Sequence, residues 1–266
     1  MRFLYLSAFL LLGALFNSCG DDTPPPRRPL AEVVRQIQPN ATLEGIEPRI
    51  TAATNRAFMR KSASPLTDLR DEITSVKGAE YERLVSYWAA FTDFQIGVFG
   101  NSHNDDAGAK AALDRGIALL ESVERKNAEE LSLLAFLQGF STEFASDTEV
   151  IGISDKAQAN IAAAMKLNPD NLRTQYVLGC LDYYTPKEFG GGKVAKIHLS
   201  RATNLPANSI DSPYLPSWGK AEAYELLVRH YTAEGQLDVA EATLEEGLAL
   251  YPDDHQLSLL VSADTE

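Results

Sequence analysis

The residues of this 266-residue chain that most suggest chemistry form a Gly-Gly-Gly-Lys run at positions 190–193. Exposed backbone amides in such a run, next to the start of a helix, attract phosphate and other anions. The phosphate-loop pattern also requires a glycine where the chain has Lys187 and a serine or threonine where it has Val194. A turn followed by a helix start is the favoured interpretation, with weak anion binding as the alternative.

Other residue types that catalyse reactions or hold metals are scattered. The histidines lack the spacing of a zinc site, and the polar residues between 101 and 106 lack the spaced ligands of a calcium loop and favour helix capping. No serine or cysteine lies beside a plausible base in the sequence. We therefore expect no enzyme activity and no cofactor or metal. The four histidines are His103, His198, His230 and His255.

Cys180 and a group of aromatic residues have structural interpretations. Cys180 follows Leu178 and Gly179, a context that favours a small buried apolar side chain over a catalytic thiol. The aromatic residues recur at helical spacing, which indicates a buried stripe, although facing helices can also line an apolar ligand pocket. The stripe consists of Tyr81, Tyr87, Trp88, Phe91, Phe94 and Phe99.

Composition and charge exclude one class of partner. The chain has 24 Lys and Arg against 37 Asp and Glu, a net charge of −13, so its surface repels nucleic acid phosphates. With 45% hydrophobic residues it has ample material for a core. We expect a globular protein of one or two domains that does not bind nucleic acid.

The body of the chain predicts an all-α fold, because apolar residues recur three and four positions apart and strand-type alternation is almost absent. A less certain set of helices spans 30–76. The clearest predicted helices are 79–99, 105–123, 127–145, 155–167, 171–184, 193–204, 217–233 and 237–250.

A small-large-small pattern repeats along these helices and ends at proline in the last three copies. It places two small residues and one large residue on one helix face, as close packing against a hairpin partner requires. The copies begin between 38 and 48 residues apart, so we expect irregular loops between them. The copies are Ala109-Leu113-Gly116, Ala157-Ile161-Ala164, Ala195-Leu199-Ala202 and Ala240-Leu244-Gly247.

The last copy and the helix before it resemble a tetratricopeptide repeat (TPR), with Val228 where that family usually has glycine. The resemblance covers about 105–260 and implies irregular stacked helix hairpins, as a TPR-like α-solenoid or a compact bundle. It divides the chain into an N-terminal helical region, 30–104, and degenerate repeats, 105–266. The matching residues are Tyr224, Leu227, Tyr231, Gly235, Ala240, Leu244, Gly247 and Pro252.

The TPR resemblance also implies a binding surface, because stacked hairpins present the first helix of each pair on a concave face. Outward residues of two such helices become candidate groove residues: Arg173, Tyr176, Cys180, Tyr183, Glu222, Glu225 and Arg229. Loops on a rigid scaffold often carry binding groups as well. The candidate loop residues are Lys187, Phe189, Gly190, Gly191 and Gly192.

The N-terminus has the features of a targeting signal. One positive charge is followed by an uncharged run, Phe3 to Phe16, which has the length of a signal-peptide core and is too short to span a bilayer. Ser18-Cys19 after it resembles a bacterial lipobox, which implies signal peptide 1–18, lipidation of Cys19 and a location in the cell envelope. Gly20 favours the outer membrane, and the proline-rich segment 19–29 is typical of a tether.

Two functions remain open at this point. The first is a membrane-anchored scaffold that binds a protein or peptide in the cell envelope. The second is a transporter-accessory protein that binds a small ligand or a periplasmic transport component, since a lipoprotein with TPR-like units and Phe189-Gly190-Gly191 before a helix resembles the accessory component of tripartite periplasmic (TRAP) transporters. An open charged groove favours the first, and a pore or closed apolar cavity favours the second.

Overall fold

The computed structural model describes residues 28–263, and Cys19 with the predicted signal peptide lies outside them. The fold is a TPR-type helical repeat, and residues 28–263 contain helices and turns but no strand. Within this part of the chain, none of the helices combines the length and apolarity needed to cross a bilayer. The helices are α1 (Leu30–Val34), α2 (Ile46–Arg60), α3 (Ser64–Ser75), α4 (Glu82–Ser102), α5 (Asp106–Glu121), α6 (Ala128–Ser141), α7 (Asp147–Leu167), α8 (Leu172–Tyr184), α9 (Ala195–Asn204), α10 (Lys220–Ala233), α11 (Leu237–Leu250) and α12 (His255–Ala263), with short 3-10 turns η1 (Thr142–Phe144) and η2 (Lys187–Phe189).

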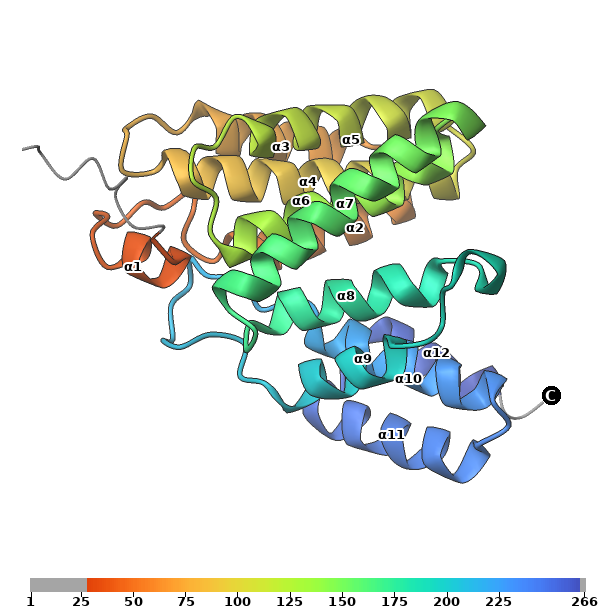
Figure 1. The fold of residues 1–266 in the computed structure, drawn as a ribbon. Helices are drawn as coiled ribbons and strands as arrows, with labels where there is room; N and C mark the ends of the chain where they lie inside the picture. The colour runs from red at the N-terminus through yellow and green to blue at the C-terminus, as the bar shows by residue number, and fades with distance from the viewer. Residues whose placement is uncertain (1–27, 264–266) are drawn as a thin grey trace, which may run out of the picture.

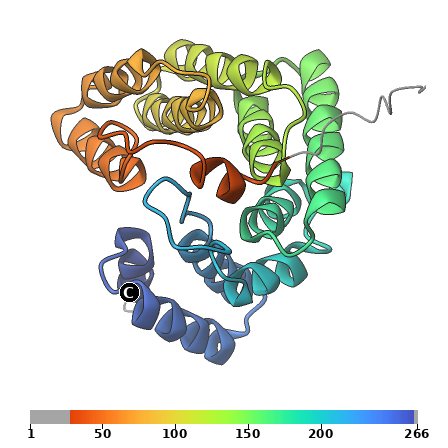
Figure 2. The same ribbon diagram turned by 90° about the vertical axis from the view of Figure 1, so that its left-hand side faces the viewer.

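Consecutive helices pair as hairpins, from α2/α3 through α10/α11, and α12 packs against the last pair (Figure 1). The first helices of successive hairpins, α2, α4, α6, α8 and α10, also contact one another and form an inner layer. The second helices lie outside them. Figure 2 shows the hairpins arranged as an arc, with α1 and the connection between α9 and α10 lying on its inner side.

Small residues hold the two helices of a hairpin close together, as the repeated pattern predicted. All twelve residues of the four small-large-small copies are buried. On the partner helix, a Cβ added at Gly179 would lie 2.6 Å from Cγ of Leu199, and one added at Gly97 would lie 3.0 Å from Cγ of Leu113. The glycines of α8 and α4 therefore permit these contacts with α9 and α5.

Two helices differ from the sequence-based expectation. Helix α7 begins at Asp147 rather than near 155, so much of the spacing between the first two copies is helix and not loop. Its first turns start at a capping box formed by Ser146 and Glu149 but bury no side chain, so they lack apolar periodicity. Helix α12 was not predicted. It covers the end of the array by inserting Leu257 against the last hairpin.

The predicted boundary between 104 and 105 falls in the turn that joins α4 to α5. These helices form one hairpin, with Gly100 against Ala109, and the apolar core continues from Leu30 to Leu227 across this point. The capping interpretation of this polar turn is confirmed, because Asp105 accepts a hydrogen bond from the Gly108 amide at the start of α5 (2.9 Å).

The hairpin contact can be tested with two Gly→Ala substitutions on helices. Gly179→Ala should lower the free energy of unfolding by about 1–3 kcal/mol, because the added methyl overlaps Leu199. Gly152→Ala on α7 is the matched control, since nothing lies within 4 Å of the added Cβ. It should stabilise the protein by about 0.5–1 kcal/mol. Urea denaturation measures both, and equal effects of the two changes would contradict the packing described.

Candidate functional site

The concave face of the arc, where TPR-type scaffolds expose their inner helices, is covered here by the chain itself. We call residues 205–219, which connect α9 to α10, the inner loop, and residues 28–45 the N-terminal segment. Both lie against the inner helices (Figure 2). The inner loop contains Leu215 and Trp218, both buried in the same apolar cluster as the inner helices.

Trp218 is the main apolar anchor of the inner loop. Its ring stacks on Phe91 of α4 (centroids 5.5 Å apart) and on Phe136 of α6 (5.8 Å), and meets Tyr176 of α8 edge-on at 6.0 Å. Its indole Nε1 donates a hydrogen bond to the hydroxyl of Tyr87 (3.0 Å). The predicted aromatic stripe on α4 is therefore core, and part of that core receives the inner loop.

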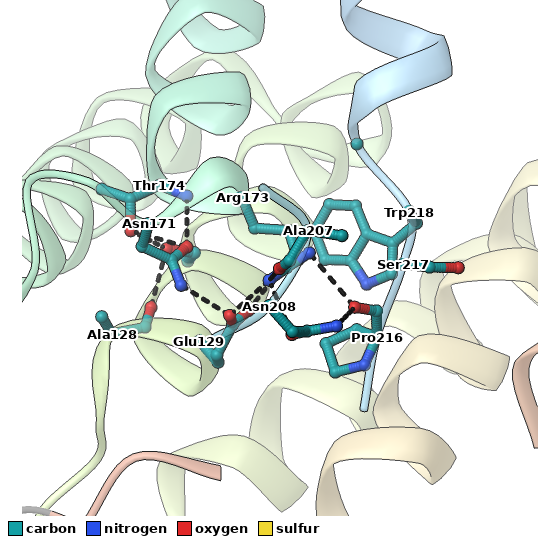
Figure 3. Close-up of polar contacts among 12 residues, drawn as sticks. Ala128, Glu129, Asn171, Arg173, Thr174, Ala207, Asn208, Pro216, Ser217 and Trp218 are labelled. Atoms are coloured by element: carbon teal, nitrogen blue, oxygen red, sulfur yellow. Dashed lines mark hydrogen bonds and ion pairs between the residues drawn. The ribbon is translucent and has the colours of Figure 1, made fainter. Parts of the chain in front are cut away.

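Arg173 is the main polar anchor (Figure 3). Its guanidinium donates from Nε to Glu129 Oε2 (2.5 Å) and from Nη2 to Glu129 Oε1 (2.7 Å), which gives a bidentate ion pair between α8 and α6. The same group donates to backbone carbonyls of the inner loop, at Pro216 (3.2 Å) and Ala207, and to the side chain of Asn208 (3.3 Å). One buried side chain thus joins two inner helices to both ends of the inner loop.

The start of α8 positions this ion pair. Asn171 is the N-cap of α8 and accepts a hydrogen bond from the Thr174 amide (2.9 Å). Its side-chain amide donates to Glu129 Oε1 (2.5 Å), and the Thr174 hydroxyl lies 2.8 Å from that of Ser132 on α6. Both carboxylate oxygens of Glu129 are therefore hydrogen-bonded, as a polar side chain that is only 11% exposed requires.

The N-terminal segment is bonded to the inner loop. The amide of Asn40 donates to the hydroxyl of Tyr214 (3.0 Å), and the amide of Gly45 donates to the carbonyl of Pro213 (3.0 Å). The indole of Trp88 on α4 donates to the carbonyl of Tyr214 (3.1 Å). Two segments more than 160 residues apart in the chain therefore cover the concave face together.

Glu47, at the start of α2, forms a further link to the inner loop by accepting a hydrogen bond from the Ser217 amide (2.5 Å). Burial raises the pKa of Glu47 to about 7, and the nearby negative charge of Glu222 acts in the same direction. The Ser217 hydrogen bond and the positive charge of Arg173 lower the pKa but do not offset burial. Burial thus disfavours the charged form of the Glu47 side chain near neutral pH.

The expectation that Arg173, Tyr176 and Cys180 point outward is wrong. Their side chains are buried, Arg173 being 1% exposed, and the inner loop contacts both Arg173 and Tyr176. Tyr183 is half-buried and packs edge-on against Tyr184 (centroids 5.0 Å apart). No sequence pattern on α8 could reveal this cover, which comes from residues 34 to 45 positions away from Arg173.

The candidate residues of α10 lie near α8. Glu222 accepts a hydrogen bond from the Gly219 amide (2.8 Å), and burial raises its pKa. Glu225 pairs with Arg229 one turn later (2.9 Å), and both charges act on Tyr184, whose pKa burial raises to about 12. Glu225 and Arg229 therefore lie near Tyr184, an exposed tyrosine at the end of α8.

The glycine-rich turn between α8 and α9 is an ordered structure. Gly190 and Gly192 have φ angles of +93° and +75°, which favour glycine, and a Cβ at Gly191 would overlap the carbonyl of Thr185. The Asp182 carboxylate accepts hydrogen bonds from the amides at 194 (2.8 Å) and 195 (2.7 Å). This side chain already occupies the anion-attracting start of α9, so the turn interpretation holds over the phosphate-loop one.

Two aromatic side chains project from this turn and the end of α8. Phe189 is 80% exposed and Tyr184 is 67% exposed. Lys187, the other candidate of this loop, is also exposed. Lys187 and Phe189 are therefore at the surface, whereas most candidate residues of α8 are interior.

The described residues give no sign of metal or nucleophile chemistry. No group of three or more His, Cys, Asp or Glu side chains within 28–261 could hold a metal ion. Cys180 is a buried free cysteine, and burial raises the pKa of its thiol to about 12, which disfavours the reactive thiolate.

A small pocket lies beside the Arg173–Glu129 pair. It has a volume of about 290 Å³ and is bordered by the N-terminal segment, the starts of α6 and α8, and the inner loop. Leu30, Leu172 and Leu215 provide an apolar part of the lining, and Asn127 and Asn171 a polar part. The pocket is slightly smaller than the roughly 300–1,000 Å³ of most ligand sites.

Sequence reasoning missed the residues that fix the inner loop. Glu129, Trp218, Tyr214 and Glu47 were not predicted, since each acts through a partner far away in the sequence. One signal was available for Trp218: a tryptophan in a connection rich in Pro, Asn and Ser is out of place unless it is buried against something.

Comparison with known proteins identifies the fold and not a family. No family model matches the chain, and no curated protein matches it in sequence. A solved structure of a thermophilic TPR protein from Thermus thermophilus is similar over 80% of this chain and 97% of that one, at 15% identity and a TM-score of 0.51. The HusA haemophore from Porphyromonas gingivalis matches 70% of this chain and 94% of its own, at 20% identity and a TM-score of 0.45.

Arg173→Met should destabilise the protein by about 3–5 kcal/mol, because it leaves the Glu129 carboxylate buried without its partner. It should also speed proteolysis within the inner loop, which loses contacts at Ala207 and Pro216. Arg201→Met is the control, since the Arg201–Asp170 pair is 47% and 69% exposed and should cost under about 1 kcal/mol. Equal losses in the two variants would contradict a dominant role for Arg173.

Proposed function

We propose that this protein is a lipid-anchored scaffold of the bacterial cell envelope that binds a protein partner and catalyses no reaction. The TPR-type fold supports protein binding in general terms. The observation that carries the finer proposal is the exposure of two aromatic side chains, Phe189 on an ordered turn and Tyr184 at the end of the helix before it. The concave face is covered by the chain itself, so the partner binds at this edge of the array.

The turn is suited to binding because it is ordered before a partner arrives. The carbonyl of Asp182 accepts a hydrogen bond from the amide of Gly192 (2.9 Å), and its carboxylate accepts from the start of α9. A rigid loop loses little conformational entropy on binding, so most of the contact energy of Phe189 contributes to affinity. Large aromatic residues are also the usual energetic anchors of protein interfaces.

The charge of the side chains near the turn favours an acidic partner. Lys187 and Lys193 are exposed in the turn that carries Phe189, and Lys196 is exposed in the first turn of α9, in a chain whose net charge is −13. A partner with an apolar socket for the phenylalanine and acidic residues around it would complement this region and not the rest of the surface. We therefore propose an acidic protein surface as the binding counterpart.

A transporter-accessory role is the second candidate. The pocket of about 290 Å³ beside Arg173 supports it, because apolar walls with a few polar groups are typical of ligand sites. This pocket would admit only a small molecule. In this role the protein partner at the Phe189 turn is a periplasmic transport component, so both proposed functions use the same binding surface.

Membrane anchoring is proposed from the sequence alone, since Cys19 lies outside the described residues. The structure is compatible with it in one respect: the first described residue, Arg28, is at the surface, with its carbonyl held by the Asn127 side chain (3.0 Å). A tether that ends at this exposed residue need not pass through the folded domain.

The partner-binding surface can be tested by placing a photoreactive phenylalanine analogue at Phe189 in cells of the source organism. We expect a crosslinked protein adduct at 189. With that partner purified, Phe189→Ala should weaken binding by about thirtyfold, since truncating an anchor costs about 2 kcal/mol. Surface plasmon resonance measures the affinity.

Ile151 supplies the matched control for this experiment. It is an apolar side chain, 71% exposed on α7, a helix that does not flank the turn. The photoreactive group at 151 should give no adduct, and Ile151→Ala should leave affinity within about twofold. The same adduct from both positions, or unchanged affinity in Phe189→Ala, would rule out the proposed surface.

Cys19→Ala tests the anchor. The variant should incorporate no radiolabelled palmitate and should lose its membrane association, because the thiol that would carry the acyl chains is absent. Cys180→Ala is the control and should be labelled like the unchanged protein, since its thiol is buried. Palmitate in the Cys19→Ala variant, or none in the unchanged protein, would exclude lipidation at this residue.

A further inference from the structure

A second pocket lies between α2 and α3, on the first hairpin of the array, and it has a different chemical character. Its volume is about 410 Å³. Three arginines of α2 line one side, and acidic residues of α3 lie on the other. The charged and polar lining residues are Arg49, Arg56, Arg60, Ser64, Asp68 and Glu72.

The three arginines share one face of α2, because their spacings of seven and four residues are helical repeats. Arg49 is already paired: it bonds to Glu72 Oε2 (2.6 Å) and to the carbonyl of Thr42 (2.7 Å). Arg56 and Arg60 are exposed, and within residues 28–263 neither has an ion pair or a side-chain hydrogen bond. Two guanidinium groups one turn apart thus line the pocket with all their donors available.

This arrangement costs stability in the absence of a ligand. Like charges at positions i and i+4 of a helix repel each other. Arg60 lies in the last turn of α2, where a positive charge favours the helix dipole, but Arg56 lies one turn earlier and gains little from it. An acid on the other helix could have paired with Arg56, as Glu72 does with Arg49, yet Asp68 is not within ion-pair distance.

The arginine cluster on α2 is unusual because the chain as a whole is acidic. Residues 101–263 contain 13 Lys and Arg against 24 Asp and Glu, whereas residues 28–100 contain nine of each. Arg49, Arg56 and Arg60, followed by Lys61, concentrate positive charge on one short segment of an acidic protein. An anion approaching the protein is therefore repelled by the acidic part of its surface and attracted to the arginine side of α2.

We propose that the α2–α3 pocket binds a small anion with two or more acidic oxygens, a phosphate or polycarboxylate, between Arg56 and Arg60. Guanidinium groups bind such oxygens by paired, charge-assisted hydrogen bonds. Asp68 and Glu72 lie on the other side of the pocket, where an extended anionic surface such as a bilayer would meet them as well as the arginines, whereas a small solute can bind between Arg56 and Arg60 alone. This site is independent of the partner surface at Phe189.

The test is an NMR titration of the full chain with sodium phosphate and, separately, sodium citrate, at constant ionic strength. The arginine Nε–H signals are assigned from the single variants Arg56→Gln and Arg60→Gln. We expect these two signals to shift saturably, and backbone amides of α2 and α3 to report the same affinity. The double variant Arg56→Gln/Arg60→Gln should bind at least about tenfold more weakly, since it lacks both charged donors.

The double variant Lys156→Gln/Lys166→Gln is the matched control, because it removes the same charge from exposed positions of α7. It should bind within about twofold of the unchanged chain. Shifts that sodium chloride reproduces, or equal weakening by both double variants, would overturn the site. Flotation with phosphatidylglycerol but not phosphatidylcholine vesicles, lost in Arg56→Gln/Arg60→Gln while free anions give no shift, would assign the arginines to a membrane surface and overturn the small-anion proposal.

Discussion

The pair formed by Arg173 and Glu129 is the interaction on which the rest of the inner face depends. A guanidinium has five N–H donors in one plane, and burying it is favourable only when charge and donors are both satisfied. Here two donors engage the carboxylate on α6, and others engage carbonyls at 207 and 216. A lysine could not make these contacts together, because its ammonium is a compact point charge with three donors.

The position of the inner loop follows from this pair. Once the loop is held at 207 and 216, Trp218 enters the space between Phe91, Phe136 and Tyr176, and the loop can bond to the N-terminal segment through Tyr214. The apolar inner surfaces of three hairpins are then removed from water. What other TPR-type scaffolds expose as a groove becomes interior here.

Ion pairs of the same type join other inner helices. Arg83 of α4 forms a bidentate pair with Glu130, the residue next to Glu129 at the start of α6. Glu130 also accepts a hydrogen bond from the amide of Asn127 (2.8 Å), so it completes the capping box of α6. Two adjacent glutamates at one helix start thus connect α6 to both neighbours, and their negative charge suits the positive end of the helix dipole. The hairpins themselves are held differently, by small residues that let backbones approach.

The sequence by itself determined the elements and their pairing. Helical periodicity, the small-large-small pattern and the glycines at hairpin contacts are local properties, because a helix face is defined by residues three and four apart. The TPR-type fold and the buried aromatic stripe could be predicted for that reason.

Only the tertiary structure decided which helix faces are exposed to solvent. Arg173 and Arg229 both lie on inner helices, yet one is buried beneath the inner loop and the other is exposed beside Glu225. That cover depends on contacts between residues up to 174 positions apart, and no periodicity within a single helix carries information about them.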